Sequence, residues 1–288
     1  MRVPDEVRQC VVFLGQSQVD ADGNEGLYLR GTAFFVHVPS ESLENWGYTY
    51  LVTARHVAER LVGGEFFIRV NDTSGGSELV WSGGVRWWTH PFDPIVDVAA
   101  FPWSPPREHV EYKTVPSRMF VNDEIIADNN IGIGDEVFMT GLFAHMTGSR
   151  RNLPILRMGN IAMMPPEPVP TREGLMDAYL IEARSLGGVS GSPAFVRQTA
   201  PVGIGSFHLL GLMHGHWDIP VEAKNDHLSG GSDLLGSVNM GIAIVVPAAK
   251  ILQVLNHTGL VAMRTASDAE EAARRAQAPV PAEDAVSR

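Results

Sequence analysis

The feature that most constrains the fold of this chain is a series of short apolar segments, rich in Val, Phe, Trp and Tyr and separated by turns of Gly, Asn, Asp and Ser. Such runs predict strands rather than helices. Six lie in the first half of the chain, near residues 9–15, 27–38, 49–55, 65–70, 78–88 and 95–102. After a polar, proline-broken connection at about 103–133, six more lie near 135–142, 154–164, 178–184, 193–198, 207–214 and 239–246. Two sets of six predict an all-β fold of two six-stranded barrels packed together.

The C-terminal part has a different pattern. Residues 247–258 predict a helix that begins at Pro247, carries an apolar face and ends before Gly259. Alanine and mixed charge in residues 264–288, followed by two prolines, predict a short helix around 266–277 and then a flexible tail. We therefore expect three parts: an N-terminal barrel at 1–115, a C-terminal barrel at 116–246, and a helix with a tail at 247–288.

Composition excludes several classes of protein. With 288 residues, of which 44% are hydrophobic, the chain can bury substantial cores. Its net charge of −11 argues against nucleic-acid binding, and no apolar run is long enough to predict a membrane span. Cys10 is the single cysteine, so no disulfide can form within the chain, and the N-terminus has no signal-peptide pattern. We expect a cytoplasmic protein.

Three segments carry residues that together suit hydrolysis. Ser190 lies in a glycine-rich run at 187–193, His56 follows an apolar strand, and Asp97 interrupts the apolar segment 95–101. A serine hydroxyl needs an imidazole to take its proton during attack, and the imidazole needs a carboxylate to hold its tautomer. The order His56, Asp97, Ser190 therefore predicts a catalytic triad, which requires no cofactor.

Each of these residues alone is weak evidence, because a serine in a glycine-rich stretch is most often an ordinary turn. Their joint occurrence, each on an apolar strand or glycine-rich turn, is much more specific. The glycines allow the N–H groups of Gly188 and Ser190 to converge on the oxyanion of a tetrahedral intermediate. Asp93 is the alternative carboxylate, but it precedes Pro94 and is better suited to a local turn bond.

These segments resemble those of trypsin-like serine peptidases, in particular the bacterial, disulfide-free kind that includes the HtrA and glutamyl-endopeptidase groups. The similarity extends over most of residues 8–256 and includes the segments 31–36, 210–212 and 240–247. It implies a chymotrypsin-like fold of two antiparallel barrels, with the active site in the cleft between them. It also implies the roles given above to His56, Asp97, Ser190 and Gly188.

The substrate pocket is less constrained by the sequence. The resemblance implies that the segment 211–217 forms one wall, with Met213, His214 and His216, and that Arg184 and Ser185 lie near another. Both a pocket for an acidic side chain and one for a medium apolar side chain fit this pattern. The two histidines are also compatible with a metal site completed by Asp218, His227 or Asp233, but a pocket wall is the simpler interpretation, and we assign no metal.

Val189 stands where zymogen-type relatives have an aspartate that pairs with a newly freed N-terminus. Valine cannot form that ion pair, so we expect no activation by N-terminal cleavage. The oxyanion hole then forms either constitutively or with the help of a ligand or partner protein.

The sequence therefore predicts a serine endopeptidase acting on a peptide or protein substrate through an acyl-enzyme intermediate. A latent or inactive member of the fold, which serves as a binding or effector protein until a partner switches it on, is the main alternative. Hydrolysis of non-peptide esters or amides is chemically possible as well.

Overall fold

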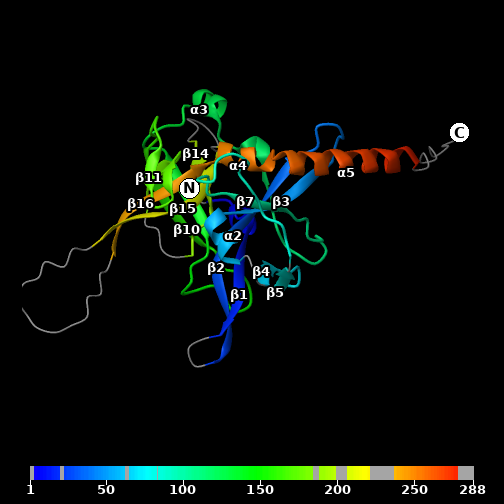
Figure 1. Ribbon diagram of the computed structural model, residues 1–288, viewed down its shortest axis with the longest axis horizontal. Helices are drawn as coiled ribbons and strands as arrows, with labels where there is room; N and C mark the ends of the chain where they lie inside the picture. Colours follow the sequence, from blue (N-terminus) through cyan, green and yellow to red (C-terminus); the bar gives the residue numbers. More distant parts are fainter. Residues whose placement is uncertain are drawn as a thin grey trace, which may run out of the picture.

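The computed structural model describes residues 3–19, 23–61, 65–82, 84–183, 188–198, 206–220 and 237–277. Two β structures lie side by side, and the last two helices follow them (Figure 1). The helices are α1 (Glu6–Gln9), α2 (Arg55–Leu61), α3 (Asp123–Asn129), α4 (Ala248–Leu255) and α5 (Thr258–Gln277), with a 3₁₀ turn η1 (Ser117–Met119).

The first sheet contains eight strands. They are β1 (Val11–Val19), β2 (Glu25–Pro39), β3 (Gly47–Thr53), β4 (Phe66–Asn71), β5 (Ser77–Ser82), β6 (Trp88–Thr89), β7 (Ala99–Pro102) and β8 (Val115–Pro116). Their order is β5-β4-β1-β2-β3-β7-β6, and β8 pairs with β2 in parallel. The sheet curves like a barrel around Phe13, Phe34 and Leu51, which are fully buried.

A second closed barrel was expected here, and that prediction is not confirmed. The sequence suggested one strand over 78–88, but β5 ends at Ser82 and the chain turns at Gly84, where φ is +68°. The segment then pairs with β7 only through the two residues of β6. Because β5 and β6 lie at opposite ends of the strand order, the described sheet is open.

The second set of strands forms a closed barrel in the order β10-β13-β16-β15-β14-β9. Its strands are β9 (Glu136–Gly141), β10 (Ile155–Met163), β13 (Tyr179–Glu182), β14 (Pro193–Arg197), β15 (Phe207–Pro220) and β16 (Ser237–Pro247). All six match segments expected from the sequence, and all neighbouring pairs are antiparallel. A hairpin of β11 (Val169–Thr171) and β12 (Gly174–Met176), not expected from the sequence, lies outside this barrel.

The C-terminal helices differ from the prediction at Gly259. Helix α4 ends at Leu255, and α5 then runs unbroken from Thr258, so Gly259 opens a helix instead of ending one. The ring nitrogen Nδ1 of His257 accepts a hydrogen bond from the Gly259 N–H at 3.1 Å, which pairs one of the free amides at the start of α5. A Cβ atom at Gly259 would lie 2.3 Å from the Trp88 ring, so close packing requires the glycine.

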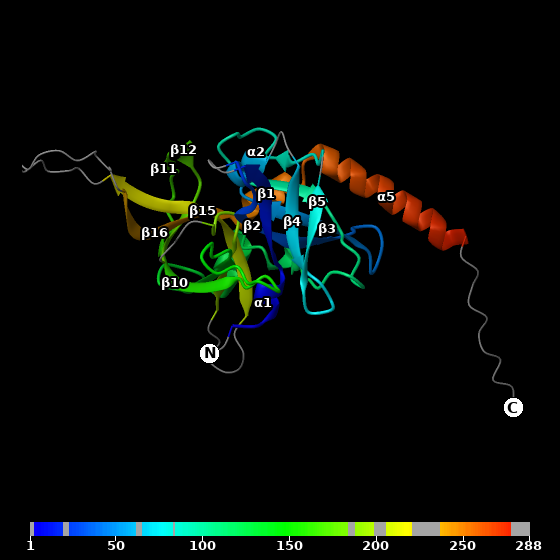
Figure 2. The same ribbon diagram turned by 90° about the horizontal axis from the view of Figure 1, so that it is seen from below.

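Helix α5 and the β15–β16 hairpin extend from opposite sides of the molecule, as Figures 1 and 2 show. The helix is fastened at its start, where Arg264 donates to the Tyr50 hydroxyl at 3.0 Å and its carbonyl accepts from Tyr48 at 2.8 Å. One turn further on, Asp268 accepts hydrogen bonds from Ser40 and Ser42 at 2.9 Å each. No helix among the described residues is long and apolar enough to cross a membrane.

The first sheet and the barrel are joined by a hydrogen-bonded connection. The side chain of Asn152 donates to the Arg69 carbonyl at 2.6 Å, and its backbone N–H donates to the side chain of Asn71 at 2.7 Å. The Arg69 guanidinium in turn donates to the Gly148 carbonyl at 2.7 Å. Strand β4 of the first sheet is thus fixed to the loop between β9 and β10.

Candidate functional site

The His56 imidazole and the Asp97 carboxylate form a hydrogen-bonded pair. His56 is the second residue of α2, just after β3, and Asp97 precedes β7. His56 Nδ1 lies 2.8 Å from Asp97 Oδ2, and the His56 backbone N–H donates to Oδ1 at 2.9 Å. Asp93 instead accepts a local turn bond from the Ile95 N–H at 2.9 Å. Two bonds from one residue fix the orientation of the Asp97 carboxylate, which is fully buried.

Ser190 lies in a tight turn just before β14. Gly188 and Gly191, on either side, have φ values of +98° and +83°, which L side chains rarely adopt. A Cβ at Gly191 would also lie 2.1 Å from the Thr32 carbonyl oxygen. Val189 between them is buried in the apolar core of the barrel, and no ion pair among the described residues lies behind this turn. The glycine spacing thus holds Ser190 at the boundary between barrel and first sheet.

Thr32, on β2 of the first sheet, anchors this turn. Its hydroxyl donates to the Gly188 carbonyl and accepts from the Leu142 N–H, each at 2.9 Å. Its backbone N–H donates to the Ser190 carbonyl at 3.0 Å. Since Thr32 is fully buried, these bonds have no competition from water. The first sheet therefore positions the serine-bearing turn as well as His56 and Asp97.

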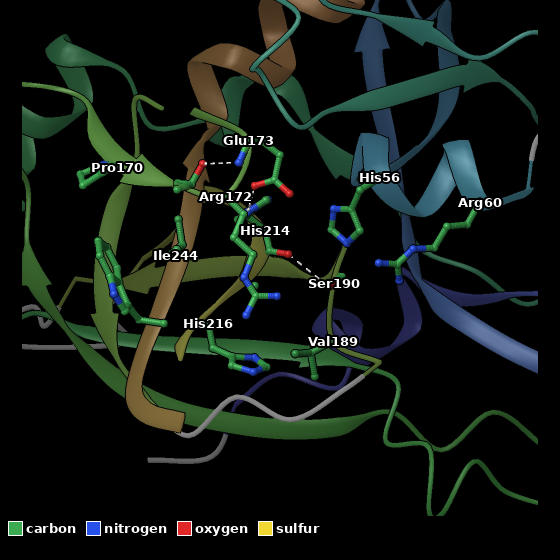
Figure 3. A pocket seen from close by; sticks show the side chains of 13 residues that line it. His56, Arg60, Pro170, Arg172, Glu173, Val189, Ser190, His214, His216 and Ile244 are labelled. Atoms are coloured by element: carbon green, nitrogen blue, oxygen red, sulfur yellow. Dashed lines mark hydrogen bonds and ion pairs between the residues drawn. The ribbon is translucent and has the colours of Figure 1, made fainter. Parts of the chain in front are cut away.

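The Ser190 hydroxyl donates to the His214 backbone carbonyl at 3.1 Å (Figure 3). Figure 3 also shows the His56 imidazole on the same side of the pocket, directed toward the serine. Among the described residues, no hydrogen bond joins Ser190 to His56. Proton transfer from this hydroxyl to His56 therefore needs a rotation about the Ser190 side chain first.

His214 brings a second imidazole to Asp97. It is the extra residue of a β-bulge in β15, because Met213 pairs with Val245 and Gly215 with the preceding residue of β16. Its Nδ1 lies 2.6 Å from Asp97 Oδ2, and its Nε2 lies 3.1 Å from Glu173 Oε2 in the turn between β11 and β12.

The charges around Asp97 determine its ionisation. Burial would raise the pKa of Asp97, but the hydrogen bonds from His214 and His56, with the charges of both rings, hold that pKa far below its usual range. Burial would lower the pKa of His214, yet Asp97 and Glu173 outweigh it and leave that pKa raised. Asp97 is therefore anionic at neutral pH, and the protonated form of His214 is more favoured than that of an ordinary histidine.

A cavity of about 410 Å³ lies in front of these residues. Its wall includes the sequence-predicted residues His56, Ser190, His214 and His216. Other side chains also line it: Arg60, Pro170, Thr171, Arg172, Glu173, Val189, Trp217 and Ile244. Arg184 and Ser185, expected at another wall, lie outside the described residues.

Met213 does not lie where the pocket prediction placed it. It is fully buried in the barrel core, in the same apolar cluster as Val189. The alternation of side chains along a strand sends Met213 inward, and the bulge after it turns His214 toward Asp97. The wall of the cavity is formed by His214 and His216 instead.

A metal site on this strand was the other interpretation of its histidines. His56, Asp97 and His214 bring ligand-type atoms within 4.8 Å of one another. Both Nδ1 atoms are nevertheless directed at the same Asp97 oxygen, so hydrogen bonds account for this cluster. The alternative ligands His227 and Asp233 lie outside the described residues, as does the side chain of Asp218.

Besides several residues of the cavity wall, sequence reasoning missed two residues whose hydrogen bonds hold the site together. Thr32 belongs to a segment that was identified only as a strand, since no local pattern marks a hydroxyl that bonds to residues of the barrel far away in the sequence. Glu173 follows Thr171 and precedes Gly174, a recognisable turn signal. The contact of Glu173 with His214 depends on how that hairpin folds back, which has no sequence signal.

No protein-family model matches the chain, and no curated protein matches its sequence. Among solved structures, the apo form of the MamO protease domain from Magnetospirillum magneticum is similar, with a TM-score of 0.52 and 14% sequence identity. The match covers 86% of this chain and 96% of the MamO domain. The chain therefore has a fold like that of a chymotrypsin-like protease domain, and at this identity the similarity concerns the fold alone.

Proposed function

We propose that this protein is a serine endopeptidase that hydrolyses peptide bonds through an acyl-enzyme intermediate. The observation that carries the proposal is the hydrogen-bonded pair of His56 and Asp97, 2.8 Å apart, with His56 directed toward Ser190 on the same side of the cavity that both residues line. An accessible serine beside an oriented imidazole is the arrangement that acyl transfer needs.

In this mechanism the Ser190 hydroxyl rotates toward His56 and attacks the substrate carbonyl while His56 Nε2 takes its proton. Asp97 holds Nδ1 protonated and balances the charge that develops on the ring. The N–H groups of Gly188 and Ser190 stabilise the oxyanion. His56 then returns the proton to the leaving amine, and water hydrolyses the acyl-enzyme by the same steps.

The test is covalent labelling of the purified protein with a fluorophosphonate probe, followed by mass spectrometry of the labelled peptide. We expect one adduct, on Ser190, and none in Ser190→Ala. Ser192→Ala is the matched control, because that buried hydroxyl has no hydrogen-bond partner among the described residues and its loss leaves the turn intact. Equal labelling of wild type and Ser190→Ala would overturn the assignment.

Peptide turnover by Ser190→Ala and by His56→Ala should fall by a factor on the order of 10⁴ to 10⁶, to the residual rate supplied by binding and the oxyanion hole. The unfolding free energy of Ser190→Ala should change little, whereas His56→Ala should be less stable because it removes one hydrogen bond to the buried Asp97 carboxylate. A Ser190→Ala protein that keeps more than about a tenth of the wild-type turnover would assign the nucleophile elsewhere.

A latent binding or effector protein is the second candidate, and the direction of the Ser190 hydroxyl favours it. That hydroxyl donates to the His214 carbonyl at 3.1 Å. It therefore cannot donate its proton to His56 until the Ser190 side chain rotates. A latent protein would be labelled slowly when alone and faster with a partner or peptide bound. Labelling at the same rate with and without an added peptide pool would exclude this candidate.

A further inference from the structure

His214 stands between two carboxylates. Its Nδ1 lies 2.6 Å from Asp97 Oδ2, and its Nε2 lies 3.1 Å from Glu173 Oε2. A neutral imidazole has one N–H and one lone pair, so it can donate to only one of these carboxylates. Hydrogen bonds to both require a proton on each ring nitrogen. The geometry is therefore that of an imidazolium cation.

The surroundings of His214 favour this cation. Its side chain is 10% exposed, and the balance of burial against its two carboxylate partners leaves its pKa raised. The ring of His56, from α2, lies edge-on with its centroid 5.5 Å away. In the part of the chain that the structure describes, the titratable and charged groups that face it or line the same cavity are His56 and Arg60 from α2, Asp97, Arg172 and Glu173 from the β11–β12 turn, and His216 from its own strand.

The turn that carries Glu173 has a defined conformation. The Thr171 hydroxyl accepts from the Glu173 N–H at 3.2 Å and donates to the Gly174 carbonyl at 2.8 Å. Gly174 has φ of +127°, and a Cβ there would lie 2.9 Å from Ile95 Cδ1. Since Ile95 belongs to the segment that carries Asp97, the hairpin packs directly on that segment and presents Glu173 to His214.

We propose that Glu173 and His214 are positioning residues of this site. Glu173 keeps His214 doubly protonated, and His214 shares the Asp97 carboxylate with His56 while fastening the β11–β12 turn to the cavity wall. The role of this pair in catalysis rests on the peptidase function proposed above, whereas its charge state does not.

The pair also makes the site sensitive to a rise in pH above the ordinary pKa of histidine. A histidine whose folded pKa is raised stabilises the fold fully below its ordinary value of 6.5, and that stabilisation is lost as pH rises through the folded value. Once His214 loses a proton, one nitrogen presents a lone pair to a carboxylate. The contact with Asp97 or with Glu173 is then broken, and the β11–β12 turn loses its attachment.

The charge state can be measured without any activity, by ¹⁵N NMR of the histidine rings in the Ser190→Ala protein between pH 5 and 10. At pH 6.5, where an ordinary histidine is half protonated, we expect most of His214 to carry a proton on both ring nitrogens, with the signal identified by its absence in His214→Gln. Glu173→Gln should move the transition of His214 to lower pH. Glu167→Gln removes an equal charge from an exposed residue before β11 and should leave the pH of the His214 transition unchanged.

A His214 that is half deprotonated at or below pH 6.5, or a transition that Glu173→Gln does not move, would overturn the proposal. In protein that retains Ser190, Glu173→Gln should lower the probe-labelling rate by about threefold to tenfold relative to Glu167→Gln at a pH between the two His214 transitions, where His214 is still protonated in wild type and not in Glu173→Gln, with a smaller loss at pH 6. An equal loss at both pH values would reduce Glu173 to a structural residue. Failure of Ser190 to react at all would refute the peptidase function while the NMR result stands.

Discussion

At the scale of single residues, Thr32 connects the two β structures at the point where the site is assembled. Replacing Thr32 with valine keeps the shape of the side chain but leaves the Gly188 carbonyl and the Leu142 N–H without their partner. We expect the free energy of unfolding to fall by about 1–3 kcal/mol. The probe-labelling rate of Ser190 should fall as well, because the turn is less well fixed.

Thr140, on β9 of the barrel, provides the control for this substitution. It is also fully buried, but its hydroxyl has no hydrogen-bond partner among the described residues. Thr140→Val should therefore be neutral or stabilising in urea unfolding. Equal destabilisation by the two substitutions would show that valine itself, rather than the lost anchor, is responsible.

The ionisation of Asp97 predicts how stability depends on acid. Its folded pKa lies far below the ordinary 3.8, so its contribution is complete above that value and is lost as pH falls through the folded pKa. Asp97→Asn should therefore have a much lower free energy of unfolding than wild type at pH 6, and the difference between the two free energies should become smaller below about pH 4. Urea unfolding of both proteins between pH 3 and 7 measures this difference. A difference that stays constant over that pH range would contradict the assignment of a charged Asp97.

At the scale of elements, the start of α5 depends on close packing rather than on helix propensity. In an exposed helix, Gly→Ala stabilises by about 1 kcal/mol. At Gly259 the added Cβ would lie 2.3 Å from the Trp88 ring, so we expect Gly259→Ala to destabilise by about 1–3 kcal/mol instead. The thermal unfolding midpoint measures the effect.

A double substitution tests whether contact with the Trp88 ring is the cause of this destabilisation. With Trp88→Leu in place, the ring that meets the new Cβ is gone, so adding Gly259→Ala should cost little or become favourable. If Gly259→Ala costs as much in the Trp88→Leu protein as in wild type, the steric explanation fails.

At the scale of the whole molecule, the site requires the first sheet and the barrel to keep their relative positions, since His56 and Asp97 come from one and Ser190 from the other. Asn152 is 3% exposed and bridges them through hydrogen bonds to β4. We expect Asn152→Ala to lower the free energy of unfolding by about 1–3 kcal/mol and to slow the labelling of Ser190. Urea unfolding and labelling kinetics of the same preparation measure both effects.

Asn160 supplies the matched comparison. Its side chain also donates to a backbone carbonyl, that of Gly134, at 2.8 Å, but the bond is exposed and lies within the barrel side of the molecule. Asn160→Ala should therefore change stability by less than Asn152→Ala and leave labelling unaffected. If both substitutions slow labelling to a similar extent, the Asn152 hydrogen bonds between the first sheet and the barrel have no specific role in positioning Ser190.

The local sequence pattern was sufficient to predict much of the fold and three residues of the candidate site. Alternating apolar segments with turn residues predicted all six strands of the barrel, because side-chain alternation and turn chemistry are short-range properties of the chain. The same pattern singled out His56, Asp97 and Ser190, since each stands out against an apolar or glycine-rich background.

Tertiary structure decided the features that depend on residues far apart in sequence. The edges of the first sheet do not meet, because the chain turns at Gly84 and leaves only two residues for β6. Thr32 reaches the serine turn, and Glu173 reaches His214, only once separate elements have packed together. The sequence determined which side chains were present for chemistry. Packing determined which of them form hydrogen bonds with one another, because a hydrogen bond acts over about 3 Å and no sequence spacing encodes that distance.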